Sequence, residues 1–245
     1  MKIIRTADYN DMSQKAAQLM IEKIRLQPDM TLGLATGSTP KGVYAELIND
    51  HQKNGTSYEK ITTINLDEYI GLPPSDPSSY RHFMNSELFD QLDIRLENTH
   101  LPNGAAEDMS QECERYEQLI KELVDIDLQL LGIGRNGHIG FNEPGTSFHS
   151  RTHVVDLAES TRKANARFFN SIEDVPAQAI TMGIASILDS REILLLASGS
   201  AKAEAIRQLI YAEPDEQFPA SALKLHANVT IIADEEALSL VSKDR

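Results

Sequence analysis

A histidine and a glutamate lie five residues apart in a glycine-rich loop, the segment GIGRNGHIGFNEPG at residues 132–145. The loop follows the apolar run IDLQLL. A carboxylate partner fixes the tautomer of an imidazole and keeps its pKa near neutrality, which suits acid–base catalysis. His138 and Glu143 are therefore predicted to form an acid–base pair. The competing interpretation is a histidine that serves only the structure.

The same loop matches a second pattern, because Gly132, Gly134 and Gly137 have the G-x-G-x-x-G spacing of dinucleotide-binding proteins. Asp156 follows at about the distance expected of the residue that binds the ribose. The third glycine of that motif must open a helix, however, and the next residues, HIGFNEPGTSFHS, contain helix breakers throughout. We interpret the match as incidental and predict no nucleotide cofactor.

Two adjacent carboxylates, Asp67 and Glu68, end the apolar strand segment ITTINL. Ligands of parallel sheets lie beyond the carboxyl ends of the strands, so these side chains are expected beside a ligand. The alternative is that they cap a helix or form a turn.

The segment ATGSTPKG predicts an anion-binding loop between a strand and a helix. Gly37 allows close approach of a ligand to the backbone. Ser38 and Thr39 supply hydroxyls, and the following helix supplies unpaired N–H groups. The alternative is a plain turn in which Thr39 caps the helix and Pro40 is the first helical residue.

A second loop, ASGSAKA, repeats this scheme with Gly199, Ser200 and Lys202 before a helix. Lysine in a first helical turn is unfavourable unless an anion is near. Arg167 is a candidate for a bidentate contact with the same anion. The seven histidines show no metal-binding spacing, and there is no H-E-x-x-H motif or Cys/His cluster, so no metal site is predicted.

Alternating segments must position these residues. Strand-like runs such as TLGL, ITTINL, IDLQLL, EILLLAS and VTIIAD alternate with amphipathic, helix-like runs. This order predicts βαβ units, an α/β fold class and a mostly parallel sheet. No linker divides the chain, so residues 1–245 are expected to form a single domain.

The composition excludes several classes of protein. The net charge of −14 disfavours nucleic acid and anionic membranes as partners. The longest apolar run is too short for a transmembrane helix, and the single cysteine, Cys113, excludes a disulfide framework. These features predict a cytoplasmic protein.

Six segments, in this order, resemble the glucosamine-6-phosphate deaminases, also called isomerases: LGLATGSTPKGVY, NLDEYIGL, SSYRHFMNSELFD, GHIGFNEP, TRKANARFF and GSAKA. The resemblance covers nearly the whole chain. It implies a Rossmann-like α/β/α sandwich with a mostly parallel central sheet. It also implies conversion of glucosamine 6-phosphate and water to fructose 6-phosphate and ammonia, without an organic cofactor.

The resemblance also implies roles for single residues. Asp67 would be the base that moves a proton between C2 and C1, and His138 with Glu143 would open the pyranose ring. The residues assigned to the substrate and its phosphate are Thr36, Gly37, Ser38, Thr39, Gly137, Arg167 and Lys202.

The chain departs from the allosteric branch of that family in three places. Asn136 replaces an aspartate beside the ring-opening histidine; it can still orient the ring but adds no charge. After Arg151 the chain has His153, Val155 and Asp156 where that branch has basic residues. The chain also lacks the C-terminal tail of that branch. We therefore expect hyperbolic kinetics, no activation by N-acetylglucosamine 6-phosphate, and a monomer or small homo-oligomer.

Two other functions fit the resemblance less well. A 6-phosphogluconolactonase-like hydrolase would keep the phosphate loop but would not need Asp67 as a base at C2. A non-catalytic sugar-phosphate sensor of the kind fused to transcription regulators would carry a DNA-binding segment, which the sequence does not suggest.

Overall fold

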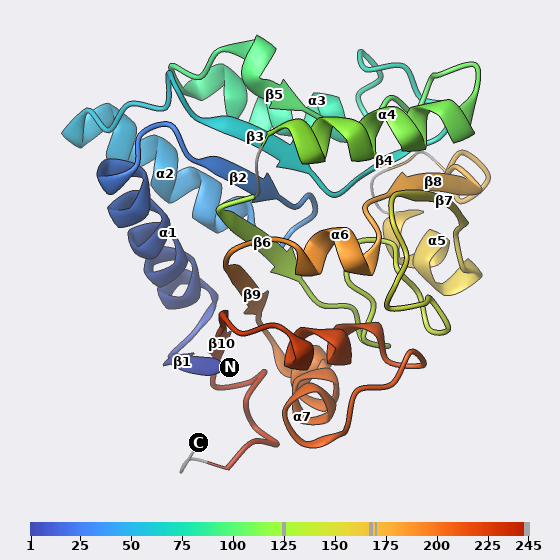
Figure 1. Cartoon of the computed structure of the whole chain (residues 1–245). Helices are drawn as coiled ribbons and strands as arrows, with labels where there is room; N and C mark the ends of the chain where they lie inside the picture. Colours follow the sequence, from blue (N-terminus) through green and yellow to red (C-terminus); the bar gives the residue numbers. More distant parts are fainter. Residues whose placement is uncertain (124–125, 167–168, 170, 243–245) are drawn as a thin grey trace.

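The computed structural model describes residues 1–123, 126–166, 169 and 171–242 (Figure 1). Its α-helices are α1 (Tyr9–Leu26), α2 (Lys41–Asn54), α3 (Tyr80–Glu87), α4 (Met109–Glu122), α5 (Glu159–Asn165), α6 (Ile184–Leu188) and α7 (Ala203–Tyr211). Its strands are β1 (Lys2–Thr6), β2 (Thr31–Leu34), β3 (Thr62–Asn65), β4 (Asp67–Tyr69), β5 (Thr99–His100), β6 (Leu128–Gly132), β7 (His153–Asp156), β8 (Gln178–Thr181), β9 (Ile193–Ala197) and β10 (Val229–Asp234). Short 3-10 helices cover Phe89–Gln91, Leu96–Asn98, Ser200–Lys202 and Pro219–Leu225.

Seven strands form the central sheet in the order β1-β10-β9-β6-β2-β3-β5. Neighbouring strands of this sheet pair in parallel throughout. The predicted α/β class with a mostly parallel central sheet is therefore confirmed.

Helices cover both faces of this sheet, with α1 and α2 on one side and α4, α6 and α7 on the other (Figure 1). The side chains of β6 show how this is achieved, because Leu128 and Leu130 pack with the first set of helices and Leu131 with the second. Successive side chains of a strand point to opposite faces, so a strand buried on both faces must be apolar at every position. The run IDLQLL follows this rule at four of its six positions. The exceptions are Asp127, which precedes β6, and the buried Gln129, whose Nε2 donates to the carbonyl of Leu130.

Polar side chains define where several helices begin. Asp8 accepts a hydrogen bond from the backbone N–H of Asp11 at the start of α1. Ser79 does the same for His82 in α3. Each carboxylate or hydroxyl satisfies one of the N–H groups that the first helical turn leaves unpaired.

A second, antiparallel sheet with the order β4-β8-β7 lies beside the first. It corrects one expectation: Asp67 does not end the strand ITTINL, because β3 ends at Asn65 and Asp67 begins β4. The change of partner strand occurs at Leu66, and Asp67 pairs with Thr181. The carboxylate still lies just past the carboxyl end of β3.

The strand order reverses between β2 and β6. From β2 the chain proceeds outward through β3 to β5, and from β6 it proceeds in the opposite direction through β9 and β10. The connections that leave β2 and β6 therefore diverge and open a crevice at the carboxyl edge of the sheet, where ligands of such folds bind.

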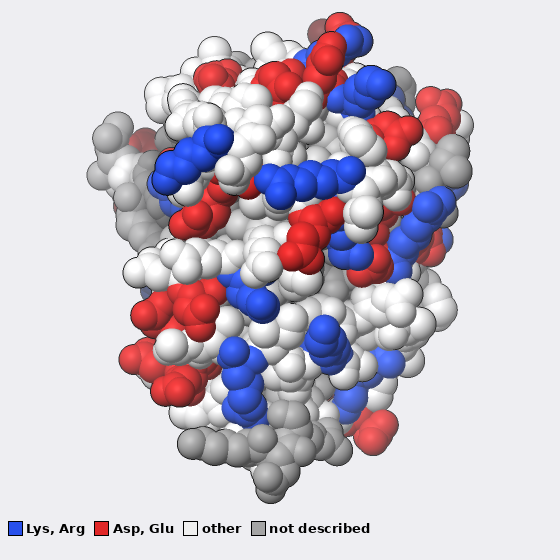
Figure 2. Space-filling model, turned by 90° about the vertical axis from the view of Figure 1, so that its left-hand side faces the viewer, with Lys and Arg blue, Asp and Glu red and all other residues white. Residues whose placement is uncertain are grey.

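The surface over α1 and α2 carries basic and acidic side chains side by side (Figure 2). No helix in the described part of the chain is long and apolar enough to cross a membrane.

Candidate active site

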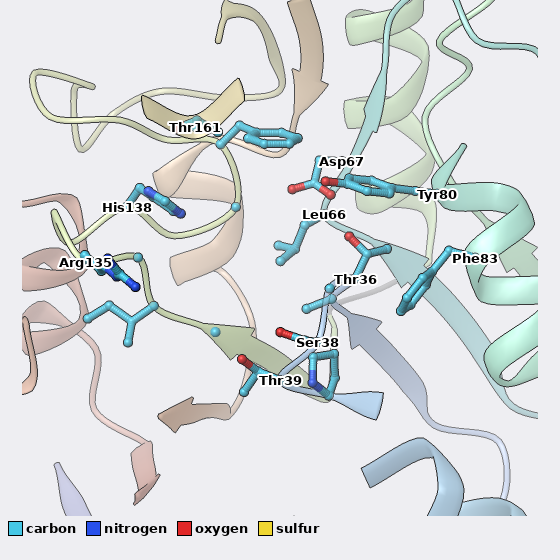
Figure 3. Close-up of a pocket in the computed structure, with 18 of the residues that line it drawn as sticks. Thr36, Ser38, Thr39, Leu66, Asp67, Tyr80, Phe83, Arg135, His138 and Thr161 are labelled. Carbon is cyan, nitrogen blue, oxygen red and sulfur yellow. The ribbon is translucent and has the colours of Figure 1, made fainter. Parts of the chain in front are cut away.

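A cavity of about 940 Å³ occupies the crevice between the connections that follow β2 and β6 (Figure 3). All four loops expected at this edge contribute to its lining. The contributions are residues 35–40 after β2, Leu66 and Asp67 after β3, residues 132–136 with His138 after β6, and Ser198, Ala201 and Lys202 after β9. Helices α3 and α5 complete the walls with Tyr80, Phe83, Thr161 and Lys163.

The loop between β2 and α2 has the properties of an anion-binding turn. Gly37 has a φ of 96°, which is costly for other residues, and a Cβ there would meet no atom within 4 Å. Helix α2 begins at Lys41 after Pro40, without a side-chain cap, so Thr39 does not cap the helix. Thr36, Ser38 and Thr39 line the cavity instead (Figure 3).

The loop after β9 differs from the sequence-based expectation. The backbone N–H of Gly199 donates to both oxygens of Asp234, and that of Ser200 donates to Glu236 at 3.1 Å. These amides therefore do not form a second cradle for a ligand. Lys202 does reach the cavity, and its Nζ donates to the carbonyl of Ile133 at 2.6 Å.

Asp67 is a buried carboxyl that faces the cavity. Its residue is only 6% exposed, and among the described residues its carboxylate accepts no hydrogen bond. Burial, and secondarily the charge of Glu68, raise the pKa of Asp67 to about 8. A carboxyl with a pKa near neutrality can both accept and return a proton.

Glu68 has a structural role, although it is adjacent. Its carboxylate accepts hydrogen bonds from the backbone N–H groups of Tyr69, Tyr80 and Arg81. It therefore pairs N–H groups at the start of α3 and holds that helix against β4. The two interpretations of this acidic pair thus apply to different members: Asp67 faces the cavity and Glu68 caps a helix.

His138 lies across the cavity from Asp67 in a connected polar group (Figure 3). Its Nδ1 is 2.7 Å from Oδ1 of Asn136, and Nδ2 of Asn136 donates to Oε2 of Glu143 at 2.7 Å. Glu143 is 3.7 Å from the ring, so Asn136 makes the direct contact.

This arrangement determines the tautomer of the imidazole. Ionised Glu143 can only accept, so the amide of Asn136 must turn its NH₂ toward it and its oxygen toward His138. Nδ1 of His138 then carries a proton, and Nε2 is left with a lone pair when the ring is neutral. Burial lowers the pKa of His138 by more than the nearby carboxylate of Glu143 raises it. The neutral ring is therefore favoured.

Aromatic rings form the wall around Asp67. Tyr80 stacks on Phe141 with an interplanar angle of 10°, and Tyr69 packs against both of these rings and Phe169. These rings line the same cavity as Asp67, and burial is the main cause of its raised pKa.

Several residues of this cavity were not predicted from the sequence, among them the aromatic side chains and three polar ones. Arg135 and Lys163 add cations to the lining, and Thr161 adds a hydroxyl. Arg135 lies directly between Gly134 and Asn136, so a search for cations within glycine-rich loops would have found it. Arg167, which was predicted to bind the anion, lies outside the described residues.

The dinucleotide interpretation fails on geometry. Gly137 has a φ of 82° and is followed by a turn, with Ile139 bridged to Asn142, and not by a helix. Asp156 accepts a hydrogen bond from Gln178 in the antiparallel sheet. Within the described residues, no group of three or more His, Cys, Asp or Glu side chains is arranged to hold a metal ion.

Residues 6–232 match the family described as glucosamine-6-phosphate isomerases/6-phosphogluconolactonase. The chain belongs to this family. This family member is 60% identical over 245 residues to a glucosamine-6-phosphate deaminase of Geobacillus sp. (strain WCH70), with 100% of this chain and 98% of the relative aligned. It is 62% identical over 242 residues to the same enzyme of Halalkalibacterium halodurans, covering 99% of this chain and 98% of the relative.

The fold of this family member has a close counterpart among solved structures. A structure described as a monomeric glucosamine-6-phosphate deaminase superposes with a TM-score of 0.96 at 55% identity, covering 98% of this chain and 100% of the other. These relatives confirm the resemblance drawn from the motifs. A 6-phosphogluconolactonase from Trypanosoma brucei superposes with a TM-score of 0.82 at 20% identity, covers 98% of each chain, and shares the fold.

Proposed function

We propose that the chain is a glucosamine-6-phosphate deaminase, which converts glucosamine 6-phosphate and water to fructose 6-phosphate and ammonia. The observation that carries this function is Asp67, a buried carboxyl without a hydrogen-bond partner among the described residues, in the same cavity as His138. The reaction needs one acid–base group that serves the C1 hydroxyl and the ring oxygen, and a second one that serves C2. The relatives that share more than half of its residues carry the same activity in their names.

The first step is ring opening at His138. The lone pair on Nε2 takes the proton of the C1 hydroxyl, and the imidazolium then delivers this proton to the ring oxygen as the C1–O5 bond breaks. Asn136 holds the proton on Nδ1, and Glu143 stabilises the imidazolium that forms. The product is the open-chain aldehyde.

The second step is proton transfer by Asp67. Its carboxylate removes the proton from C2 and returns it to C1. One proton of the amino group moves to O1 in the same conversion, so that the 2-amino aldehyde becomes its isomer with a C1 hydroxyl and an imine at C2. Water adds to this imine and ammonia leaves, so that C2 becomes the ketone of fructose 6-phosphate. The raised pKa of Asp67 suits a carboxyl that must take the proton from C2 and then give it back to C1.

The substrate phosphate is proposed to bind at the loop after β2 with Thr36, Gly37, Ser38 and Thr39, together with Gly137, Arg167 and Lys202. Gly37 and the start of α2 favour an anion there. Lys202 lines the same cavity from the loop after β9, and Arg135 supplies a further positive charge.

Release of ammonia tests the function. The protein should release ammonia from glucosamine 6-phosphate, and Asp67→Asn should lower the rate by at least about 10²-fold, the usual effect of losing a general base. Hydrolysis of 6-phosphogluconolactone without ammonia release would instead support the hydrolase. Binding of sugar phosphates without turnover would support the sensor.

We also propose that residues 1–245 act as a single cytoplasmic domain, as a monomer or small homo-oligomer, without nucleic acid or membrane partners. The net charge of −14 and the mixed charges over α1 and α2 (Figure 2) support this proposal. The monomeric deaminase of similar structure supports the assembly state. Size-exclusion chromatography with light scattering tests it.

A further inference from the structure

Thr161 makes a contact that the reaction described above does not require. It lies on α5, is 7% exposed, and donates its hydroxyl to Oε1 of Glu143 at 2.5 Å. The other oxygen of Glu143 accepts from Asn136. Four side chains from two segments therefore form one chain of hydrogen bonds that ends at His138, with Thr161 at its far end.

We propose that Thr161 is a positioning residue that sets the tautomer of His138 through Glu143 and Asn136. This inference deepens the proposed function and rests on it. The donor on Oε1 fixes the rotation of the Glu143 carboxylate, because it holds Oε1 at α5 and leaves Oε2 facing the NH₂ of Asn136. Ionised Glu143 then dictates the orientation of the Asn136 amide.

Loss of this hydroxyl opens a second arrangement. A Glu143 carboxylate that is free to rotate can release the NH₂ of Asn136, and the amide can then turn and point its NH₂ at His138. Nδ1 of His138 must then accept, and the proton moves to Nε2. The ring would present a donor to the C1 hydroxyl in place of a lone pair and could not take its proton.

The contact is not needed to hold α5 in place. Arg162, the next residue of the helix, donates to the carbonyls of Ile172 and Val175 at 3.1 and 2.9 Å. Removing one hydroxyl from α5 therefore leaves these anchors intact. The role that we assign to Thr161 is its hydrogen bond to the carboxylate of Glu143.

The test compares Thr161→Val, which keeps the shape and removes the hydroxyl, with Thr161→Ser, which keeps the hydroxyl. Thr146→Val is the matched control, because Thr146 donates to the backbone carbonyl of Glu143 and not to its carboxylate. Imidazole nitrogen NMR on protein labelled with ¹⁵N-histidine reports the tautomer, and the signals of His138 are assigned with His138→Gln.

We expect Thr161→Val to shift His138 toward the Nε2-protonated tautomer. It should lower kcat about tenfold near neutral pH and move the acid limb of the kcat/KM profile to lower pH, because the His138 imidazolium loses the support of Glu143, with little change in KM. Thr161→Ser and Thr146→Val should retain the original tautomer and profile. If Thr161→Val does not fold, Thr161→Ala provides the same comparison.

An unchanged tautomer and pH profile in Thr161→Val would overturn the proposal, as would a Thr161→Ser variant no better than Thr161→Val. The NMR measurement needs no substrate. If the wild-type protein releases no ammonia but Thr161→Val still shifts the tautomer of His138, the proposed function is refuted and the positioning role is supported.

Discussion

Asp67→Asn is expected to stabilise the folded protein while it removes activity. Burial makes the ionised carboxyl unfavourable in the folded state, where its pKa is about 8, against 3.8 for an unperturbed aspartate. Asparagine has nearly the same shape and no charge. The substitution therefore removes an unfavourable group from the fold and the proposed base from the reaction at the same time.

The magnitude and the pH window follow from these two values. Below pH 3.8 the carboxyl is protonated in both states and contributes no penalty. As the pH rises, the unfolded chain ionises and the folded chain does not, so wild-type stability falls relative to the variant until about pH 8. Each unit corresponds to 1.36 kcal/mol, so the full penalty at pH 7 is about 4 kcal/mol in a dry site. Water in the cavity solvates the carboxylate, and we expect about 1–3 kcal/mol.

Thermal unfolding measured from pH 5 to pH 8 for both proteins checks this expectation. A change of 1 kcal/mol corresponds to about 2–4 °C in a chain of this size. The Tm of Asp67→Asn should exceed that of the wild type by several degrees at pH 8 and by less at pH 5. Glu68→Gln is the contrasting control and should destabilise, because Glu68 pairs three backbone N–H groups. An Asp67→Asn variant that is less stable than wild type at pH 8, or a difference independent of pH, would refute the reasoning.

Three further outcomes are expected. Gly134→Ala should lower kcat by about 10²-fold or more, measured by ammonia release, because its Cβ would lie 2.3 Å from Nδ1 of the His138 imidazole; a near-normal rate would show that the ring position is not critical. Lys202→Met should weaken binding of glucosamine 6-phosphate by about 10-fold or more. It should leave the reaction of unphosphorylated glucosamine unchanged, and equal effects on both sugars would contradict a phosphate contact. Rates should depend hyperbolically on substrate and not respond to N-acetylglucosamine 6-phosphate, since Val155 and Asp156 offer no cation to a second phosphate; a sigmoidal curve made hyperbolic by this effector would disprove this.

The edge of the sheet that carries the site could be predicted from the sequence because its signals are local. A buried strand followed by glycines and hydroxyl side chains marks the loop after β2, and the same rule marks the loop after β6. Each of these loops has to lie at the carboxyl end of its strand whatever the rest of the fold does.

The features that could not be predicted depend on partners distant in sequence. The amides of Gly199 and Ser200 resemble those of an anion loop until β10 brings Asp234 and Glu236 beside them. The turn of the chain at Leu66 depends on pairing between β4 and β8, more than a hundred residues apart. The contact between Thr161 and Glu143 likewise joins segments that no sequence pattern connects.

The carboxylates of Asp234 and Glu236 bear on the direction in which a substrate can lie in the cavity. The loops after β2 and β9 both line the crevice and have similar sequences, so their backbones alone do not distinguish two orientations of a sugar phosphate. The two orientations would expose different carbons to Asp67, and only one of them is productive. Because Asp234 and Glu236 accept hydrogen bonds from Gly199 and Ser200, these amides disfavour a phosphate of their own, and the β9 loop contributes only Lys202 to a phosphate at the loop after β2. The regiochemistry of the reaction is then decided in part by two side chains that hydrogen-bond to the protein's own backbone.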